Sequence, residues 1–361
     1  MRVRHVVPFA LLVAALLPGA SSGAACAPLD CGPAGLSVAG GRALAVTSQR
    51  TTNVVDLSSG KVRLLLVNAV FSADGKRAVA QAGSLLQTYD LATRKVVAHE
   101  PAGSWELAGV SADGRRVVLF KKGGGTTQVA IRSGLRQQTF TFRGIFDFDG
   151  LLGTRLYLIE RAGQGGYYVR VADLTTGKLV PEPLKDADEP ALITGQAWSR
   201  VPSRDGRYLF TTYVTGNGAA MIHELDMRAG KAWCIDLPGS GDYNAAASYA
   251  TALSRDGTRL YAAAAAYGKL VTIDVATHRI LDAASFAPAQ PAEASLPSAS
   301  LSPDGKTLAF SNVNAVWLYD LAAGRVVRKA ALPTAPVVVA YGPSGRIWYV
   351  NRAGTSGRVA F

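Results

Sequence analysis

The sequence contains few of the residues that build catalytic or metal centres. Its 361 residues include 4 histidines, 3 cysteines and 3 methionines. It has no CxxCH haem-attachment motif and no complete phosphate-binding loop. Beyond the N-terminal segment only His99, His223 and His278 remain, and they lie in separate parts of the chain. We therefore expect no catalytic residue, no metal site and no cofactor.

Long apolar runs are also missing, except near the start of the chain. Two arginines precede an apolar run from Val6 to Leu17, and small residues follow it. This order is typical of a secretory signal peptide, and the run is shorter than the roughly 20 residues that span a bilayer. We expect a signal peptide at residues 1–25 and one domain at residues 26–361. The protein should then be secreted, periplasmic or in the cell envelope, without a transmembrane segment.

Cysteine is scarce, and its placement leaves two alternatives at the N-terminus. In an oxidising compartment Cys26 and Cys31 are close enough in sequence to pair, which leaves Cys234 as a buried thiol. Alternatively, residues 23–26 resemble a lipoprotein box without its usual leucine, so that lipid anchoring at Cys26 stays open as the less favoured alternative.

Acidic residues are outnumbered by basic ones. The chain has 38 Lys and Arg against 26 Asp and Glu, a formal net charge of +12. Such a balance favours anionic partners but does not by itself predict nucleic-acid binding.

What the sequence does have is an internal repeat. The phrase Ser-x-Asp-Gly begins at Ser72, Ser111, Ser203, Ser254 and Ser302. A second phrase, Asp-aliphatic-x-x-Gly or a close variant, follows at Asp56, Asp90, Asp173, Asp226, Asp274 and Asp320. Weaker copies of the first phrase lie near Gly40, Asp149 and Gly342 and bring the count to eight units.

Both phrases have the chemistry of tight turns. Glycine and aspartate accept the backbone conformations that hairpins require, and a serine two positions earlier can hydrogen-bond the turn. Arg94 and His278 replace the glycine that normally ends the second phrase. We interpret FDFDG at residues 146–150 in the same way, as an Asp-Gly turn and not as a calcium loop.

The segments between the turns predict an all-β fold. They are apolar on both faces, which indicates sheets covered on both sides. Four strands in each unit predict a β-propeller of four-stranded antiparallel blades, eight by unit count, or seven if the first and last fragments share a blade. Residues 262–266, all alanine, suit a narrow region near the axis, and residues 26–35 are expected to help close the ring.

These units resemble the YVTN and TolB-type propeller repeats of bacterial exported proteins, within the WD-repeat-like class. The resemblance is carried by SRDGTRLYAAAAAYGKLVTIDVATHRILD and SPDGKTLAFSNVNAVWLYDLAAGRVV and covers nearly all of residues 26–361. The Gly-His and Trp-Asp dipeptides of eukaryotic WD repeats are missing from the units. The resemblance implies a propeller but not one function, because such blades occur in carriers, scaffolds, lactonases and cofactor enzymes.

Propeller geometry, taken from this resemblance, sorts the candidate residues onto two faces. Basic residues follow the turn glycines and should form one basic face, with Lys76, Arg115, Arg207, Lys306 and Arg346 as its members. Acids and aromatic residues gather in the links between blades, where we place a candidate ligand site at Trp105, Asp188, Trp198, Tyr243 and Tyr249.

The sequence thus favours a non-catalytic binding or protein-interaction module, expected to be a monomer. Its partner is an unknown protein, peptide or small molecule. One alternative is a propeller enzyme of the lactonase or cofactor-dependent type. Another is binding of a polyanion or an anionic cell-wall polymer through the basic face.

Overall fold

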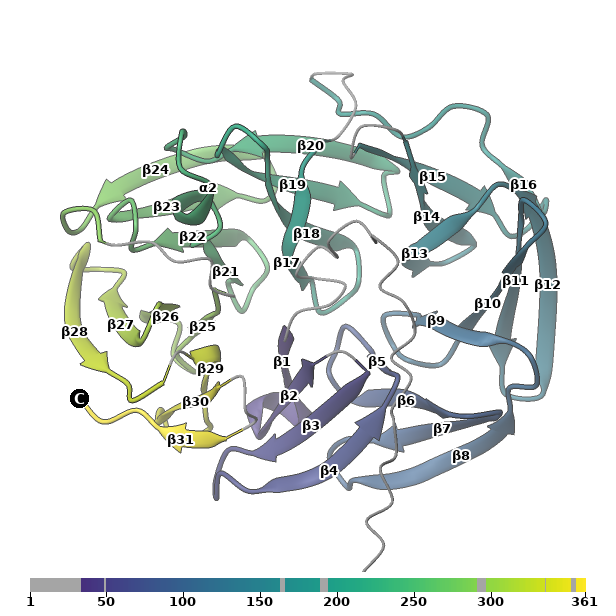
Figure 1. Cartoon of the computed structure of the whole chain (residues 1–361), viewed down its shortest axis with the longest axis horizontal. Helices are drawn as coiled ribbons and strands as arrows, with labels where there is room; N and C mark the ends of the chain where they lie inside the picture. Colours follow the sequence, from purple (N-terminus) through teal and green to yellow (C-terminus); the bar gives the residue numbers. More distant parts are fainter. Residues whose placement is uncertain are drawn as a thin grey trace, which may run out of the picture.

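Eight antiparallel sheets are arranged in a ring around a central axis (Figure 1). The structure is a computed structural model that describes residues 34–48, 50–162, 166–188, 194–290, 297–334, 336–351 and 355–361. Seven sheets have four strands and one has three. Each sheet is one blade of a β-propeller, so the prediction of an eight-bladed all-β propeller is confirmed.

The strands of each blade follow one another in sequence, and the first strand lies nearest the axis (Figure 1). Blade 1 contains β1 Ala34–Val38, β2 Ala43–Ser48, β3 Thr51–Asp56 and β4 Val62–Val67, with the short helix η1 Ala39–Gly41 after β1. Blade 2 contains β5 Ala69–Phe71, β6 Arg77–Ala82, β7 Leu85–Asp90 and β8 Lys95–Pro101. Blade 3 contains β9 Glu106–Val110, β10 Val117–Gly123, β11 Thr126–Ser133 and β12 Arg136–Arg143. Blade 4 contains β13 Phe146–Leu152, β14 Arg155–Arg161, β15 Tyr167–Asp173 and β16 Lys178–Leu179.

The second half of the ring repeats this plan. Blade 5 contains β17 Gln196–Pro202, β18 Tyr208–Val214, β19 Ala220–Asp226 and β20 Lys231–Asp236. The helix α2 Tyr243–Ala246 precedes blade 6, which contains β21 Ala250–Leu253, β22 Arg259–Ala264, β23 Lys269–Asp274 and β24 Arg279–Ser285. Blade 7 contains β25 Ala299–Leu301, β26 Thr307–Asn312, β27 Ala315–Asp320 and β28 Arg325–Ala331. Blade 8 contains β29 Pro336–Tyr341, β30 Ile347–Asn351 and β31 Ser356–Arg358.

Two kinds of turn define one face of the ring. We call the turn between the first and second strands of a blade its inner turn, and the turn between the third and fourth strands its outer turn. Because successive strands are antiparallel, both turns of a blade lie at the same end of its sheet. We call that side of the ring the turn face, and the opposite side, which carries the connections between blades, the link face.

The Ser-x-Asp-Gly phrase forms the inner turns through side-chain hydrogen bonds. Ser302 Oγ donates to Asp304 Oδ1 at 2.6 Å and accepts from Thr307 N at 3.0 Å. Gly305 supplies the left-handed conformation with φ 71°. The hydrogen bond from Ser302 lowers the pKa of Asp304. The serine and aspartate of the phrase are therefore turn residues, as predicted.

The outer turns use the aspartate of the second phrase in a similar way. Asp90 Oδ1 accepts from the backbone and the hydroxyl of Thr93 at 2.7 and 2.8 Å, which lowers the pKa of this carboxyl. Arg94 and His278 end their turns with φ 63° and 59°. Both replacements for glycine are thus in the left-handed region, which costs more for these side chains than for glycine.

FDFDG does not form a turn. It lies inside β13, which has a bulge between Phe148 and Gly150, and the inner turn of blade 4 comes later, at Gly153 with φ 57°. A Cβ atom at Gly150 would lie 2.4 Å from Met227 Sδ of blade 5. The prediction of an Asp-Gly turn at Asp149 is therefore wrong, because this glycine serves the packing of two blades.

The core consists of eight hydrophobic clusters, one between each pair of neighbouring blades. The alanine run shows how closely blades approach. Ala262 and Ala264 pack toward blade 5, whereas Ala263 and Ala265 pack toward blade 7. Small side chains here allow the second strand of blade 6 to lie close to both neighbours. Ala262, Ala263 and Ala264 of the run belong to β22, the second strand of blade 6 from the axis.

The ring closes through packing between blades 8 and 1. Val338, Ala340 and Val350 of blade 8 share a buried cluster with Leu44 and Val55 of blade 1. Among the described residues no strand of one of these blades pairs with a strand of the other. Of residues 26–35, which were predicted to help close the ring, Ala34 and Gly35 lie in β1 of blade 1. Residues 26–33 lie outside the described residues, as do Cys26, Cys31 and the signal peptide.

Candidate binding site

The inner strands and inner turns enclose an axial cavity of about 700 Å³. It is lined by segments of six blades: residues 36, 40 and 41; 73, 74 and 76; 198–202 and 204; 251–255; 297–303; and 341–343. A volume of this size lies within the range of small-molecule sites. The axis is therefore the first place to examine for function.

The hydroxyl groups on the wall of this cavity hold neighbouring blades together. Ser298 Oγ accepts a hydrogen bond from Val339 N at 3.0 Å, and Ser300 Oγ accepts one from Tyr341 N at 3.1 Å. Both bonds join blade 7 to blade 8. Ser199 Oγ donates to Thr212 Oγ1 at 3.0 Å within blade 5. These hydroxyls satisfy backbone and side-chain groups of the ring, so their positions are explained by structure.

An ion pair with a buried carboxylate supports the wall next to blade 4. Arg200 Nη2 lies 3.1 Å from Asp149 Oδ1, and the Asp149 side chain is only 5% exposed. His223 lies nearby in β19, where its ring meets the rings of Tyr167 and Tyr213 edge to face. Burial lowers the pKa of His223 to about 4, so its imidazole is neutral at ordinary pH. His223 is not among the residues that line the axial cavity.

Three exposed cations surround the turn-face mouth of the axial cavity. Lys76, Arg204 and Arg255 come from the inner turns of blades 2, 5 and 6. Lys76 forms a solvent-exposed contact of 3.5 Å with Asp74, and an Arg255 Nη1 atom donates to Pro303 O at 3.3 Å. Arg204 has no hydrogen bond or ion pair through its side chain with any described residue. The described residues of the mouth thus carry more positive than negative charge.

The residues predicted for the basic face have two different environments. Lys76, Arg115, Lys306 and Arg346 are exposed on the turn face. Arg207 is half-buried, pairs with Asp226 at 2.7 Å and lies 4.6 Å from the Tyr208 ring. Only Lys76 of the five lines the axial cavity, and Arg346 lines a second cavity described below.

The residues predicted for the link-face ligand site are dispersed, apart from one pair. Trp198 and Tyr243 meet edge to face with ring centroids 5.8 Å apart, and Trp198 also lines the axial cavity. Tyr249 is fully buried and donates to Pro238 O at 2.6 Å. Trp105 packs between blades 2 and 3, and Asp188 is exposed in the link between blades 4 and 5.

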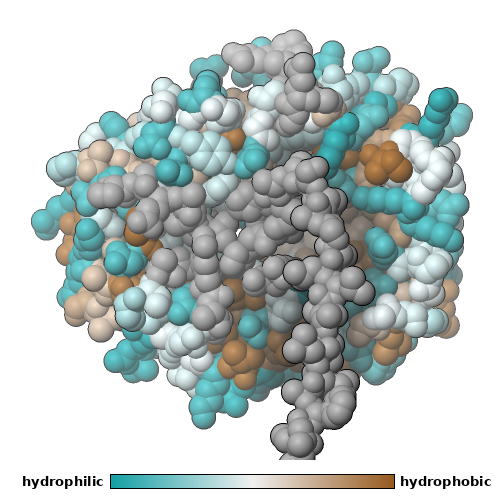
Figure 2. Space-filling view, viewed as in Figure 1, coloured by the Kyte–Doolittle hydropathy of each residue, from teal (hydrophilic) through white to brown (hydrophobic). Residues whose placement is uncertain are grey.

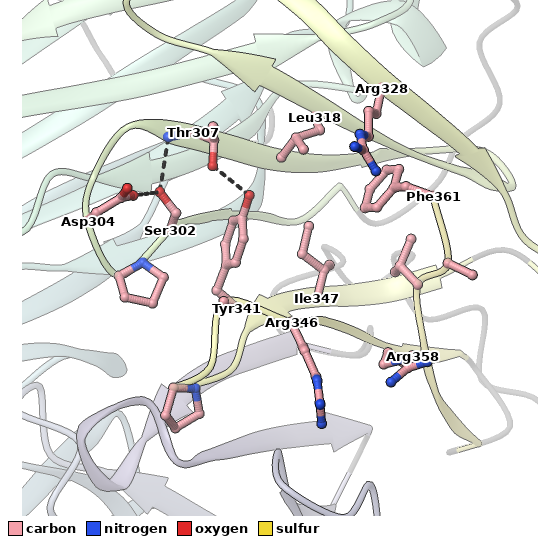
Figure 3. Close-up of a pocket in the computed structure, with 15 residues that line it drawn as sticks. Ser302, Asp304, Thr307, Leu318, Arg328, Tyr341, Arg346, Ile347, Arg358 and Phe361 are labelled. Atoms are coloured by element: carbon pink, nitrogen blue, oxygen red, sulfur yellow. Dashed lines mark hydrogen bonds between the residues drawn. The ribbon is translucent and has the colours of Figure 1, made fainter.

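A second cavity of about 690 Å³ lies between blades 7 and 8 on the turn face (Figure 3). Tyr341 and Thr307 join its walls through a contact of 2.7 Å between their hydroxyls. Ser302, Pro303, Tyr341 and Pro343 line both this cavity and the axial one. The two cavities are therefore neighbours around the inner turns of blades 7 and 8.

Sequence reasoning did not identify this second cavity. The available indication was the weak copy of the first phrase, GPSGR, in which Ser344 stands where the five Ser-x-Asp-Gly turns have aspartate. Its arginine, Arg346, consequently lacks the acidic turn partner that Lys76 and Arg115 have.

Sequence reasoning also missed a contact between blades 5 and 6. His278, predicted only as a turn residue, stacks on Trp233 with ring centroids 3.4 Å apart. Its Nδ1 atom lies 3.0 Å from Oε1 of Glu224, whose side chain is fully buried. Burial raises the pKa of Glu224 to about 8 and lowers that of His278. Both groups therefore hold less charge near neutral pH than exposed residues of their kinds.

The outer surface has no broad apolar patch in the view of Figure 2. Hydrophilic side chains lie around the rim, and hydrophobic ones form small separate spots on the described part of this face.

The half-buried Cys234 lies in β20. In the described part of the chain, no group of three or more His, Cys, Asp or Glu residues is placed to hold a metal ion. No helix among the described residues is long and apolar enough to cross a membrane.

Comparisons with known proteins give likeness of architecture only. No family model and no curated protein sequence matches the chain. Among solved structures, Kuenenia stuttgartiensis hydrazine synthase aligns at 15% identity and TM-score 0.46, covering 81% of this chain and 94% of that one. A chain of the mitotic checkpoint complex aligns at 14% identity and TM-score 0.45, covering 81% and 86%. The β-propeller domain of Myceliophteria thermophila Cps50 (Swd1) aligns at 15% identity and TM-score 0.44, covering 81% and 94%. These values carry no information about function. The fold itself defines this chain as a β-propeller scaffold.

Proposed function

We propose that this protein is an exported, non-catalytic binding module whose turn face binds an anionic ligand at the axial mouth. Export rests on the N-terminal sequence, and the resemblance to YVTN and TolB-type repeats agrees with it. The single observation that carries the binding site is the placement of Lys76, Arg204 and Arg255 around one cavity of about 700 Å³.

Charge and shape support binding at this mouth. Inner-turn carboxylates such as Asp304 already accept hydrogen bonds from their own turns, whereas the lysines and arginines next to them extend into solvent. Exposed ion pairs such as Lys76 with Asp74 contribute little stability, so these cations remain available to a ligand. A concave site also concentrates the field of several like charges.

This proposal places the ligand site on the turn face, whereas the sequence analysis predicted a ligand site on the link face. Tyr249 and Trp198 are buried, so their rings are engaged in packing. The lactonase or cofactor-enzyme alternative requires acidic or imidazole groups that converge on a reacting atom. Among the described residues that line the axial cavity, the one carboxylate is that of Asp74, which accepts from Ser72 Oγ and Lys76 N. Binding therefore accounts for this lining better than catalysis does.

The test compares two triple charge reversals on the same face. One variant carries Lys76→Glu, Arg204→Glu and Arg255→Glu at the axial mouth. The matched control carries Lys95→Glu, Lys178→Glu and Lys231→Glu, three exposed residues at outer turns. Both variants change the net charge equally, and poly-L-glutamate and polyphosphate serve as probes.

We expect the axial variant to bind both probes at least about tenfold more weakly, and the control less than about threefold, because only the first removes charges that contact the ligand. Wild-type binding should also weaken between about 50 and 200 mM salt. Equal losses in both variants would mean that net charge alone attracts the probes. If the axial variant keeps wild-type affinity, the axial mouth is not the binding site.

A further inference from the structure

Blade 8 has an unpaired strand edge. Its third strand, β31, pairs with β30 through Val350 and Ser356, Tyr349 and Gly357, and Trp348 and Arg358. Asn351 N donates to Thr355 O and Val359 N donates to Ile347 O, so every second residue directs its backbone groups toward β30. By alternation, the N–H and C=O groups of Ser356 and Arg358 point away from the sheet.

The other blades cover this position with a fourth strand. In blade 7, for example, β28 pairs with β27 along its whole length. No described strand pairs with the outer edge of β31. An open edge of this kind is a template for an added strand.

Cations lie on both sides of this edge. Arg358 is directly opposite Trp348, whose ring packs against Gly60 of blade 1, so the Arg358 side chain belongs to the blade 1 side of the sheet. Arg346 lies just before β30, in the inner turn of blade 8, and both Arg346 and Arg358 also line the cavity between blades 7 and 8. Arg328 of β28 lies across the cavity on the blade 7 side, beside Phe361 (Figure 3).

None of these three arginines is neutralised. All are exposed, and none has a hydrogen bond or ion pair through its side chain with a described residue. This separates them from Arg94, Arg207 and Arg259, which contact aspartates of the outer turns.

An apolar surface lies beside the edge. Leu318, Ile347, Val359 and Phe361 line the cavity of about 690 Å³ between blades 7 and 8, with Ile347 and Val359 buried in its floor and Asp304 on its wall. Phe361 is 43% exposed. A strand added to β31 would therefore find backbone partners, apolar contact and positive charge together.

We propose that the outer edge of β31 docks an extended acidic peptide segment of a partner protein, which adds to blade 8 as its fourth strand. Side chains of an added strand alternate between the two faces of the sheet. One set would lie on the side of Arg328 and the other on the side of Arg358, with Arg346 at the turn end of the blade, so acidic residues at either parity meet a cation. This charge complementarity favours an acidic partner over the segment 26–33, which has a single acidic residue, Asp30.

The probe is a labelled eight-residue peptide that alternates glutamate and valine, added to the full mature chain. A second peptide alternates glutamate and proline, which keeps the charge but lacks the N–H groups of a strand. The first peptide should bind and slow hydrogen exchange at the amides of Ser356 and Arg358. The proline peptide should do neither, and equal binding of both would reject strand addition.

Charge reversal tests the arginines. Arg346→Glu with Arg358→Glu should weaken peptide binding by roughly tenfold, whereas Lys178→Glu with Lys231→Glu should leave it within about twofold. Equal melting temperatures check that both variants fold. Unchanged binding in the arginine variant would overturn the proposal.

Other occupants of the edge give different results. Protection of the Ser356 and Arg358 amides without peptide, lost when residues 26–33 are removed, would assign the edge to the chain's own segment. Protection that increases with protein concentration would assign it to a second copy. Either result overturns the proposal. The axial triple variant separates this inference from the proposed function: peptide binding should survive in it, and its loss would place the peptide at the axial mouth.

Discussion

The imidazole Nδ1 of His278 lies 3.0 Å from the buried carboxylate of Glu224, across the interface between blades 5 and 6. Charged neighbours surround this contact, with Asp226 and Arg207 on blade 5 and Asp274 on blade 6. The shifted pKa values of this pair make the stability of the fold depend on pH.

We predict that stability falls as pH rises from about 6.5 to about 8. Folding raises the pKa of Glu224 to about 8, so in this window the folded chain holds a proton that the unfolded chain has lost. The free energy of unfolding then decreases with pH, by about 2 kcal/mol over the window. The lowered pKa of His278 acts in the opposite direction, but below its unfolded pKa of about 6.5. Urea unfolding of wild type and Glu224→Gln measures this, and the variant should lose the decline. An equal decline in both proteins would contradict the assignment.

Two glycines of the inner turns should respond differently to alanine. At Gly206, φ is 68° and a Cβ atom would lie 2.1 Å from Ala112 Cβ of blade 3. At Gly305, φ is 71° but no atom lies within 4 Å of the added Cβ. Gly305→Ala should cost about 1 kcal/mol, the strain of the left-handed conformation alone. Gly206→Ala should cost at least about 1–3 kcal/mol more, because the inner turns must also separate. Thermal unfolding compares them, and equal losses would reject the close approach of the turns.

The ion pair between Arg200 and Asp149 should show strong coupling. Arg200→Met leaves the buried carboxylate of Asp149 without compensation and should cost about 3–5 kcal/mol, whereas Asp149→Asn leaves an arginine side chain that is 25% exposed and should cost less. The double variant should cost clearly less than the sum of the two single variants. Denaturant titration of the four proteins completes the cycle. Additive losses would show that the two groups do not interact.

Tyr249 should behave as a core residue and not as a ligand contact. Tyr249→Ala should lower the free energy of unfolding by about 3–5 kcal/mol because it leaves a large cavity. Tyr249→Phe should cost only about 1 kcal/mol, the hydrogen bond to Pro238 O. Binding of poly-L-glutamate at the axial mouth should be unchanged in the phenylalanine variant. If Tyr249→Phe loses affinity without losing stability, Tyr249 contacts the ligand.

The sequence predicted the repeated parts of this fold well because their chemistry is local. The hydrogen bonds of Ser302 and Asp304 span a few residues, so a recurring phrase is sufficient to identify them. The same reasoning failed at Asp149, where the partner is Arg200 of the next blade. A phrase cannot distinguish an Asp-Gly pair in a turn from one that packs against a distant side chain.

The site was harder to predict for the same reason. Trp198 and Lys76 were assigned to opposite faces, yet both line the axial cavity, because a first strand crosses the ring from one face to the other. The exposure of an aromatic residue in a link also depends on blades that are distant in sequence. Tyr249 was predicted to lie in a link and is nevertheless fully buried.

The seam between blades 8 and 1 also determines how the ring would respond to mechanical load. Along the rest of the ring the chain itself passes from each blade to the next, so tension is carried by covalent bonds. At the seam the described contacts are side-chain packing, such as Leu44 and Val338, and one hydrogen bond from Ser356 to Gly60. Under tension, the ring would therefore open first at this seam and uncoil into an arc of otherwise intact blades.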